Sequence, residues 1–360
     1  MTPNDAAAVL VQAVEVARTV TCPEEYQAVW ALLEPLAADA ALSLRLGTGL
    51  LGSADPAARA TGCDLLGLAS DRDESVRGDA ASAMVSLAAG ESDDDVQWSI
   101  ARALGATQDE RALPVLVSLS EHDDPDVRFQ VASSLPSVVT PSPEDPGIPV
   151  LIRLTGDPDP DVRNWATFGL GFLVDVDTPA VRAALWERLG DDCRDAREEG
   201  IRGLARRHDE RAVGPLAELL DDDEGADLHT FEAAAVLGAR ELLPHLENYD
   251  PQSPWVAEAL TACDPVLRAR QDEAAWELLG TVQQRLPEAK VSLCAPRFDA
   301  GLTLDLATAG DAFSWSVGAL LERSGGDPGR AAALVVADAT SDRSDRSDTA
   351  DRADRADRAD

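Results

Sequence analysis

The one segment whose spacing matches a cofactor-binding motif is GTGLLG, residues 47–52, which fits the pattern GxGxxG. In dinucleotide-binding proteins this pattern follows a strand and opens a helix, so that the backbone can approach a pyrophosphate. Here SADPAAR follows, which is typical of the start of another helix, and we interpret the glycines as part of a helix end. A phosphate-binding P-loop is excluded because Lys290, the only lysine, does not follow a glycine.

Candidate metal ligands are also poorly placed. The acidic stretch LDDDEGADLHTFE, residues 220–232, resembles a calcium loop in composition, but aligning Gly225 with the sixth position puts Leu220 and Phe231 at ligand positions. Weak calcium binding by the bare acids stays open. The histidines are far apart in the sequence, at His122, His208, His229 and His245. We expect no metal and no cofactor, and because GxSxG and HExxH are absent too, the sequence leans against an enzyme without deciding the question.

The composition restricts the kind of partner. There are 66 acidic residues against 31 basic ones, a formal net charge of −35. This excess disfavours nucleic acid and anionic membranes, because both are bound through clustered Lys and Arg. The chain is 45% hydrophobic but only 4% aromatic, which favours closely packed helices. The five cysteines are scattered without a CxxC pair, and no long apolar run is present, so we expect a cytoplasmic protein with reduced thiols.

The elements that would position any site are indicated by an internal repeat. Five segments share a frame in which an Asp lies shortly before Val or Ala, a base usually follows, and a Leu lies near the end: 55–67, 93–105, 124–136, 159–171 and 194–206. The position that is usually basic recurs at intervals of 31–38 residues. It is occupied by Arg59, Gln97, Arg128, Arg163 and Arg197. The sequence therefore predicts a repetitive fold.

Each framed segment is predicted to be the second helix of a pair. Apolar residues at relative positions 0, 4 and 8 form one stripe, and the preceding Asp is a typical N-cap. We expect these helices to start near residues 57, 95, 126, 161 and 195. The first helix of each pair lies between the frames, over 109–120, 147–156, 178–190 and 209–220. Because one pair cannot bury its apolar faces alone, neighbouring pairs are expected to stack in sequence order.

A two-helix unit of this length in which DPDVR opens the second helix resembles a HEAT repeat, and more narrowly the short HEAT-like repeats named after the phycobilisome lyases. The resemblance covers about residues 50–245 and extends more weakly to the helical segments 5–19 and 23–38. It implies an all-α fold, a right-handed α-solenoid of stacked helix pairs. It implies little about function, because the family includes scaffolds, adaptors, chromophore lyases and a few DNA-repair enzymes.

The domain organisation is predicted from where the repeat fades. We expect the solenoid to occupy residues 1–285 and a C-terminal cap to occupy residues 286–340. Residues 341–360 repeat Asp and Arg with no large apolar side chain, so we expect a disordered tail there.

Within the cap, a small β-hairpin is one possibility. Residues 289–294 and 301–307 alternate apolar and polar side chains, and any sheet should be confined to this region. The following segments DAFSWSVGALLERSG and DPGRAAALVVADA, residues 311–325 and 327–339, are predicted to be helical.

Acidic turns recur in register along the repeats. Stacking would place equivalent turns along one edge, about 8–10 Å apart. We call the resulting set the acidic ridge and represent it by Asp94, Asp124, Asp159, Asp192 and Asp222. Helix capping and solubility explain such acids, and a docking surface for a basic partner is the alternative explanation.

The outward side of the second helices is the candidate binding face. Relative positions 2 and 6, which are expected to line the concave surface, carry Trp98, Arg102, Phe129, Ser133, Asn164, Phe168, Glu198 and Arg202. Exposed aromatic side chains on such a surface are typical of interaction hot spots. The alternative is that Trp98, Phe129 and Phe168 pack between repeats as core.

The sequence therefore favours a non-enzymatic protein–protein interaction scaffold or adaptor that binds a protein or peptide, with a basic surface, on the concave face. No nucleic acid and no membrane is expected as a partner. The resemblance alone implies an alternative, a lyase-like enzyme or chaperone acting on a protein-bound chromophore. A HEAT-like DNA glycosylase is disfavoured because such enzymes need a basic groove.

Overall fold

The structure is a computed structural model that describes residues 3–20, 26–222 and 226–340. The chain divides into two compact units, unit 1 and unit 2, with the boundary between Leu204 and Ala205. The tail predicted to be disordered, 341–360, lies outside the described residues. None of the helices in the described ranges is both long and apolar enough to span a lipid bilayer.

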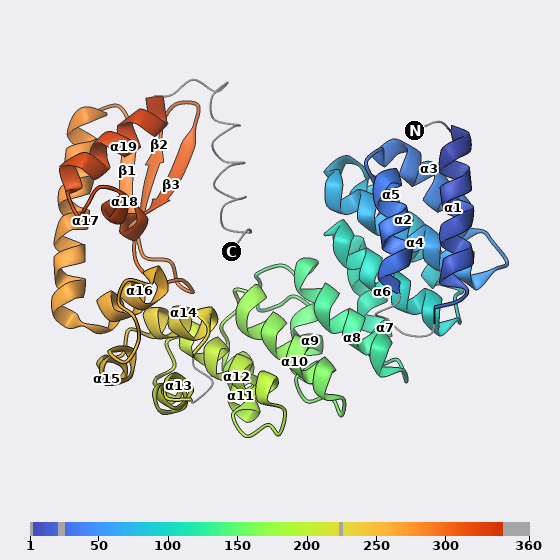
Figure 1. Cartoon of the computed structure of the whole chain (residues 1–360), viewed down its shortest axis with the longest axis horizontal. Helices are drawn as coiled ribbons and strands as arrows, with labels where there is room; N and C mark the ends of the chain where they lie inside the picture. Colours follow the sequence, from blue (N-terminus) through green and yellow to red (C-terminus); the bar gives the residue numbers. More distant parts are fainter. Residues whose placement is uncertain (1–2, 21–25, 223–225, 341–360) are drawn as a thin grey trace. The chain divides into compact units, whose positions relative to one another are not determined.

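Unit 1 consists of helices that follow one another along the chain (Figure 1). Its elements are α1 (Pro3–Ala17), α2 (Gln27–Ala37), α3 (Ala40–Leu51), α4 (Pro56–Arg72), η2 (Glu74–Val76), α5 (Arg77–Ala88), α6 (Asp94–Thr107), η3 (Glu110–Ala112), α7 (Leu113–Leu119), α8 (Pro125–Ser134), η4 (Leu135–Ser137), α9 (Gly147–Leu154), α10 (Pro160–Phe168), the π-helical turn η5 (Gly169–Leu173), α11 (Pro179–Arg188) and α12 (Arg194–Arg206), whose last residues belong to unit 2.

Neighbouring helices of unit 1 pack in the order of the sequence. Helix α4 packs on α6, α6 on α8, and α8 on α10, while α7 packs on α9 and α9 on α11. Within each pair, α5 contacts α6, α7 contacts α8, and α9 contacts α10. The stacking of helix pairs predicted from the repeat is therefore confirmed.

The starts of the second helices follow from capping. They begin at Pro56, Asp94, Pro125, Pro160 and Arg194, each one residue before the predicted start. An aspartate precedes four of these helices, and its carboxylate accepts a hydrogen bond from a backbone N–H of the first turn: Asp55, Asp93, Asp124 and Asp159. A proline at the first helical position loses nothing, because that N–H has no partner within a helix.

The predicted apolar stripe forms the interior of unit 1. In α6, the side chains of Val96, Ile100 and Leu104 are fully buried. Equivalent residues of the next two second helices are at most 1% exposed: Val127, Val131, Leu135, Val162, Ala166 and Leu170. The spacing of the stripe puts these side chains on one helical face, so burying that face against the neighbouring helices is the main source of stability.

The recurring arginine joins successive repeats. Its guanidinium binds a carboxylate in the turn of the following repeat, in the pairs Arg59–Glu91 (2.6 Å), Arg128–Asp157 (2.8 Å) and Arg163–Asp191 (2.9 Å). In each pair a second nitrogen reaches the other carboxylate oxygen, and a third binds carbonyls of the arginine's own turn. The carboxylates are only 4–6% exposed, and the hydrogen bonds from Arg59 lower the pKa of Glu91. These bidentate pairs are therefore internal links between turns.

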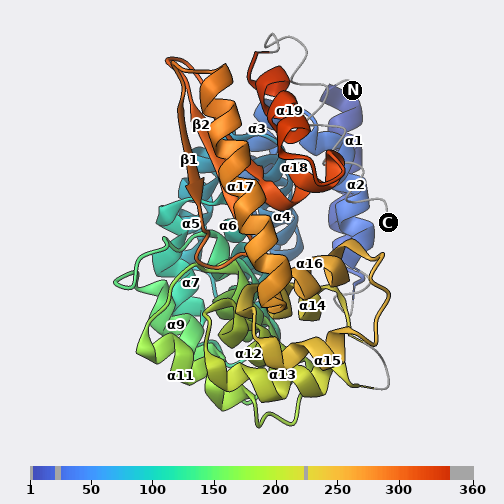
Figure 2. The same cartoon turned by 90° about the vertical axis from the view of Figure 1, so that its left-hand side faces the viewer.

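Unit 2 continues with helices and adds a small sheet. Its elements after α12 are η6 (Glu210–Ala212), α13 (Val213–Leu220), α14 (Leu228–Leu237), η7 (Arg240–Leu242), α15 (Leu243–Leu246), α16 (Pro254–Cys263), α17 (Pro265–Arg285), β1 (Lys290–Cys294), β2 (Thr303–Ala307), β3 (Ala312–Ser316), α18 (Val317–Arg323) and α19 (Pro328–Thr340). Figure 2 shows the long helix α17 beside the sheet, with α18 and α19 close to it. Leu278 of α17, Leu304 of β2 and Val335 of α19 are fully buried in one cluster.

The sheet extends further than the sequence predicted. The expected hairpin is present, because β1 pairs antiparallel with β2. The expected helix over 311–325 is wrong in its first part, where β3 pairs antiparallel with β2. Phe313 and Trp315 alternate with small residues, which suits a strand with one apolar face, and both pack against the core cluster. The Ser316 hydroxyl then accepts a hydrogen bond from the Ala319 N–H, and the helix starts only at Val317.

Candidate functional site

The eight residues expected on one binding face fall into separate groups in unit 1. Trp98 packs against the N-terminal helices. Its ring stacks on Trp30 with the ring centres 6.2 Å apart and meets Tyr26 edge-on at 5.2 Å. We call Tyr26, Trp30 and Trp98 the N-terminal aromatic cluster. Trp98 is half-buried there, which is intermediate between the exposed and the core interpretations of the sequence.

Arg102, one helical turn beyond Trp98, contacts the same cluster. Its guanidinium lies 4.3 Å from the centre of the Trp30 ring and binds the Asp64 carboxylate at 2.9 Å. The Asp64 side chain is completely buried, whereas the Arg102 side chain is 19% exposed. Such a charge can remain in the interior only while it is paired, so the first role of Arg102 is to neutralise Asp64.

A second aromatic group runs across the next two second helices. Phe129 of α8 meets Trp165 of α10 edge-on at 5.7 Å, and Trp165 meets Phe168 at 5.8 Å. Phe168 in turn stacks on Phe172 of the π-helical turn η5 at 5.5 Å. We call Phe129, Trp165, Phe168 and Phe172 the aromatic strip. Trp165 is 37% exposed and the three phenylalanines are half-buried.

Two of the expected binding residues on the same helices are polar, Ser133 and Asn164. The Ser133 hydroxyl donates to the Gln130 carbonyl of its own helix. The Asn164 side chain is half-buried, and its Oδ1 atom is buried without a hydrogen-bond partner among the described residues. A buried acceptor without a donor is unusual and calls for an explanation. Asn164 lies next to Trp165 and one helical turn before Phe168.

The last two expected residues form an ion-pair network on α12. Arg202 binds Glu198 at 2.9 Å and Glu199 at 2.8 Å, and Glu198 also binds Arg194 at 2.7 Å. Arg202 is only 7% exposed. The charges of Glu198 and Arg202 are therefore engaged within their own helix, and a role of either residue in protein binding remains a prediction.

The acidic ridge contains residues in different situations. Asp124 and Asp159 are half-buried N-caps, while Asp94 and Asp192 are exposed. Asp222 is half-buried and belongs to unit 2. Helix capping thus accounts for part of the ridge, and its role as a docking surface remains a prediction.

Substitution of Asp159 separates capping from charge. Asp159→Ala should lower the free energy of unfolding by about 1 kcal/mol, because the carboxylate accepts hydrogen bonds from the backbone N–H groups of Asp161 and Val162. Asp159→Asn should stay close to wild type, since asparagine caps as well as aspartate. Urea denaturation measures both. Equal losses in the two variants would mean that the negative charge, rather than the cap, carries the effect.

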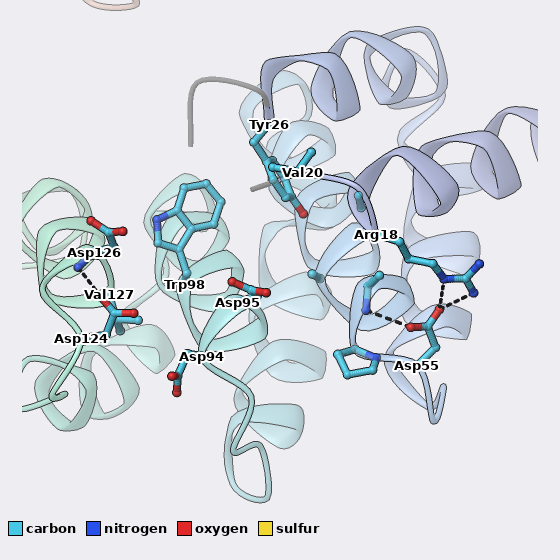
Figure 3. Close-up of a pocket in the computed structure, with 14 residues that line it drawn as sticks. Arg18, Val20, Tyr26, Asp55, Asp94, Asp95, Trp98, Asp124, Asp126 and Val127 are labelled. Atoms are coloured by element: carbon cyan, nitrogen blue, oxygen red, sulfur yellow. Dashed lines mark hydrogen bonds and ion pairs between the residues drawn. The ribbon is translucent and has the colours of Figure 1, made fainter. Parts of the chain in front are cut away.

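A pocket of about 470 Å³ opens beside Trp98 (Figure 3). Its lining includes Tyr26 and Trp98 of the N-terminal aromatic cluster, Arg18 at the end of α1, and carboxylates at the starts of three helices. These carboxylates belong to Asp55, Asp94, Asp95, Asp124 and Asp126. Sequence reasoning named Asp94, Asp124 and Trp98 but assigned them to two different surfaces.

The comparisons with known proteins agree with this architecture. A family model described as HEAT repeats matches residues 43–137 and 148–238, which is more than half of the chain. The chain belongs to the HEAT repeat family. The matched HEAT repeats include α6, α8 and α10 and therefore the aromatic strip up to Phe172.

Solved structures show similar folds at low identity. YibA from E. coli is 20% identical, with a TM-score of 0.52, over 73% of this chain and 97% of that chain. Kap95p, in a structure that describes its binding to RanGDP, is 14% identical, with a TM-score of 0.51, over 80% of this chain and 44% of that chain. At these identities the likeness concerns the HEAT fold alone.

The phycobilisome-lyase comparison is weaker. One chain in the structure of the complex of CpcE and CpcF of phycocyanin lyase from Nostoc sp. PCC7120 is 18% identical over 61% of this chain and 86% of that chain, with a TM-score of 0.41. This value is too low to favour the lyase alternative. No curated protein matches the sequence.

Two parts of the site were missed by sequence reasoning. Trp165 lies at relative position 3, next to the positions that were expected to face outward, yet it is the most exposed ring of the strip. Trp165, Phe168 and Phe172 are spaced i, i+3 and i+7, a pattern that could have shown that they share a helical face. Tyr26 and Trp30 lie in the region of weaker resemblance, and nothing in their spacing indicates that they meet Trp98.

Proposed function

We propose that this HEAT repeat chain is a non-enzymatic scaffold or adaptor that binds a basic peptide or protein segment along the aromatic strip. The observation that carries the proposal is the unbroken series of ring contacts from Phe129 through Trp165 and Phe168 to Phe172. Its members come from two successive repeats and stay partly exposed. Aromatic side chains that are held rigidly by their neighbours lose little entropy on binding, which is why they dominate interface hot spots.

The unpartnered acceptor beside the strip supports the same role. Asn164 Oδ1 has no donor among the described residues, and a backbone N–H of a bound peptide would supply one. Pairing such an atom removes the cost of a buried, unsatisfied acceptor, which is about 1–3 kcal/mol. The strip would then contribute apolar contacts and Asn164 a polar contact that fixes the register.

Charge determines which segments would bind. Exposed acids in the first turns of the same helices, Asp126 and Asp161, lie one to two turns from the strip, in a chain with a net charge of −35. Such acids steer a basic partner and repel an acidic one. We propose a cytoplasmic location, because Cys63, Cys193, Cys263 and Cys294 are free thiols, as in proteins of a reducing compartment.

The test is a binding experiment with a matched tryptophan control. Peptides are first selected from a random library on the immobilised full-length chain, and the best one is then titrated calorimetrically. Trp165→Ala should weaken its binding by about thirtyfold or more, as expected for a hot-spot residue worth about 2 kcal/mol. Trp186→Ala is the control, because Trp186 is 42% exposed but lies on α11, the first helix of its pair.

The outcomes separate the alternatives. Trp186→Ala should leave the affinity within about twofold. The free energy of unfolding of Trp165→Ala should fall by less than the about 3–5 kcal/mol of a core tryptophan. Equal affinity of the wild type and the Trp165→Ala variant would contradict the proposal. A core-sized stability loss would instead show that the strip is interior packing between HEAT repeats.

A further inference from the structure

The pocket beside Trp98 is strongly acidic. Five carboxylates line it, against the single guanidinium of Arg18, which binds Asp55 at 2.7 Å. Asp95 makes no ion pair among the described residues, and its pKa is raised by burial and by the carboxylates of Asp93, Asp94 and Asp124. A cation placed among them would relieve their repulsion.

The wall of the pocket also presents an unpaired hydroxyl group, that of Tyr26. Tyr26 is 9% exposed, and its hydroxyl has no hydrogen-bond partner among the described residues. In Figure 3 this hydroxyl points toward the space between Trp98 and Arg18. A buried hydroxyl oxygen without a partner on the pocket wall is a site that an N–H group of a ligand can fill.

The aromatic wall suits a flat cation. The ring of Trp98 lines the pocket. The adjacent ring of Trp30 already stacks with a guanidinium, because the Cζ atom of Arg102 lies 4.3 Å from its centre. A guanidinium combines a planar face that stacks on indole with N–H groups that bind carboxylates in pairs, whereas an ammonium offers only the second property. The volume of about 470 Å³ is ample for such a side chain.

From the carboxylates, the unpartnered Tyr26 hydroxyl and the indole wall, we propose that this pocket binds an arginine side chain of a peptide or protein partner. The arginine would lie against Trp98, with its guanidinium among the carboxylates of Asp95 and Asp94 and the hydroxyl of Tyr26. This inference deepens the proposed scaffold function, because it adds a specific anchor for a basic partner at the N-terminal end of the HEAT repeats. The anchor is separate from the aromatic strip and can be tested without it.

The experiment titrates the full-length chain with small probes at low ionic strength. The probes are a blocked Gly-Arg-Gly peptide, the same peptide with citrulline or lysine in place of arginine, and spermine. The arginine peptide should bind at least about tenfold more tightly than the neutral citrulline peptide, since charge-assisted hydrogen bonds are lost with the charge. It should also exceed the lysine peptide, which cannot stack as a plane. Tighter binding of spermine than of the arginine peptide would overturn the assignment in favour of a free polyamine.

Matched variants tie the binding to the pocket. Asp95→Asn should weaken the arginine peptide by about tenfold. The control Asp79→Asn removes an exposed acid from the first turn of α5, outside the lining, and should stay within about twofold. Equal affinity of the arginine and citrulline peptides, or no effect of Asp95→Asn, would refute the inference. Loss of selected-peptide binding by Trp165→Ala tests only the strip, so failure of one proposal is distinguishable from failure of the other.

Discussion

Replacement of Arg102 by methionine is expected to lower the free energy of unfolding by about 3–5 kcal/mol. The reason is the carboxylate that the substitution leaves behind. Asp64 is completely buried, and both bonds to its Oδ1 atom come from Arg102, at 2.9 Å and 3.3 Å. Its other oxygen, Oδ2, has no partner among the described residues. Without Arg102 a negative charge would remain in the interior without compensation. Urea denaturation followed by tryptophan fluorescence reports on this region, because Trp30 and Trp98 lie beside the pair.

The reciprocal variants show whether the buried charge is the cause. Asp64→Asn should cost less than Arg102→Met, because the Arg102 side chain is 19% exposed and can still be hydrated. The double variant Asp64→Leu with Arg102→Met should recover most of the loss, since replacing both partners by apolar residues is often neutral or stabilising. A single-variant loss of less than about 1 kcal/mol, the range of a surface pair, would mean that Asp64 is not stranded.

Alanine at Gly47 should destabilise unit 1, although alanine normally favours a helix. Gly47 lies inside α3, and a Cβ atom there would be 2.8 Å from the Cγ of Leu66 and 3.0 Å from the carbonyl oxygen of Gly62, both on α4. Overpacking of this kind costs about 1–3 kcal/mol. That cost exceeds the gain in helix propensity, which is at most about 1 kcal/mol. We therefore expect a lower denaturation midpoint for Gly47→Ala.

Gly49 provides a control within the same motif and the same helix. A Cβ atom at Gly49 would meet nothing within 4 Å, so Gly49→Ala should raise the free energy of unfolding by about 0.5–1 kcal/mol. The opposite signs at two positions of GTGLLG follow from close packing on α4 at Gly47 and from helix propensity at Gly49. Destabilisation by both substitutions would contradict this explanation of the motif.

The sequence determined the repeat and its helix starts. Asp at the N-cap, Pro at the first position and apolar residues at relative positions 0, 4 and 8 are local signals, and each acts within one helix. For this reason the second helices were placed to within one residue and the stripe from Val96 to Leu104 was recognised as interior. The hairpin was predicted from its alternation of apolar and polar side chains. Strand β3 was missed because it is short and is followed directly by a helix that starts at Val317, so the whole segment was assigned to the helix.

The site was less accessible to sequence reasoning. Position along a helix shows which way a side chain points, but not which partner it meets. Trp98 and Phe129 occupy the same position of successive repeats, yet Trp98 joins Tyr26 and Trp30 while Phe129 joins Trp165. The acidic side chains of the turns also differ from one another in their surroundings. The carboxylates of Asp157 and Asp191 proved to be internal partners of arginines about thirty residues earlier in the sequence, whereas Asp94 stayed exposed.

The sequence by itself determined the helices and their caps, which one or two helical turns encode, and the order of stacking and the overall acidity, which follow from the repeat and the composition of the whole chain. The tertiary structure decided which aromatic rings meet, which acids are neutralised by arginine, and that Tyr26, Trp98 and Asp95 line one pocket. The physical reason is that these groupings depend on contacts between helices far apart in the chain. Such contacts are set by the distance and angle at which the helices pack, and no local pattern records either quantity.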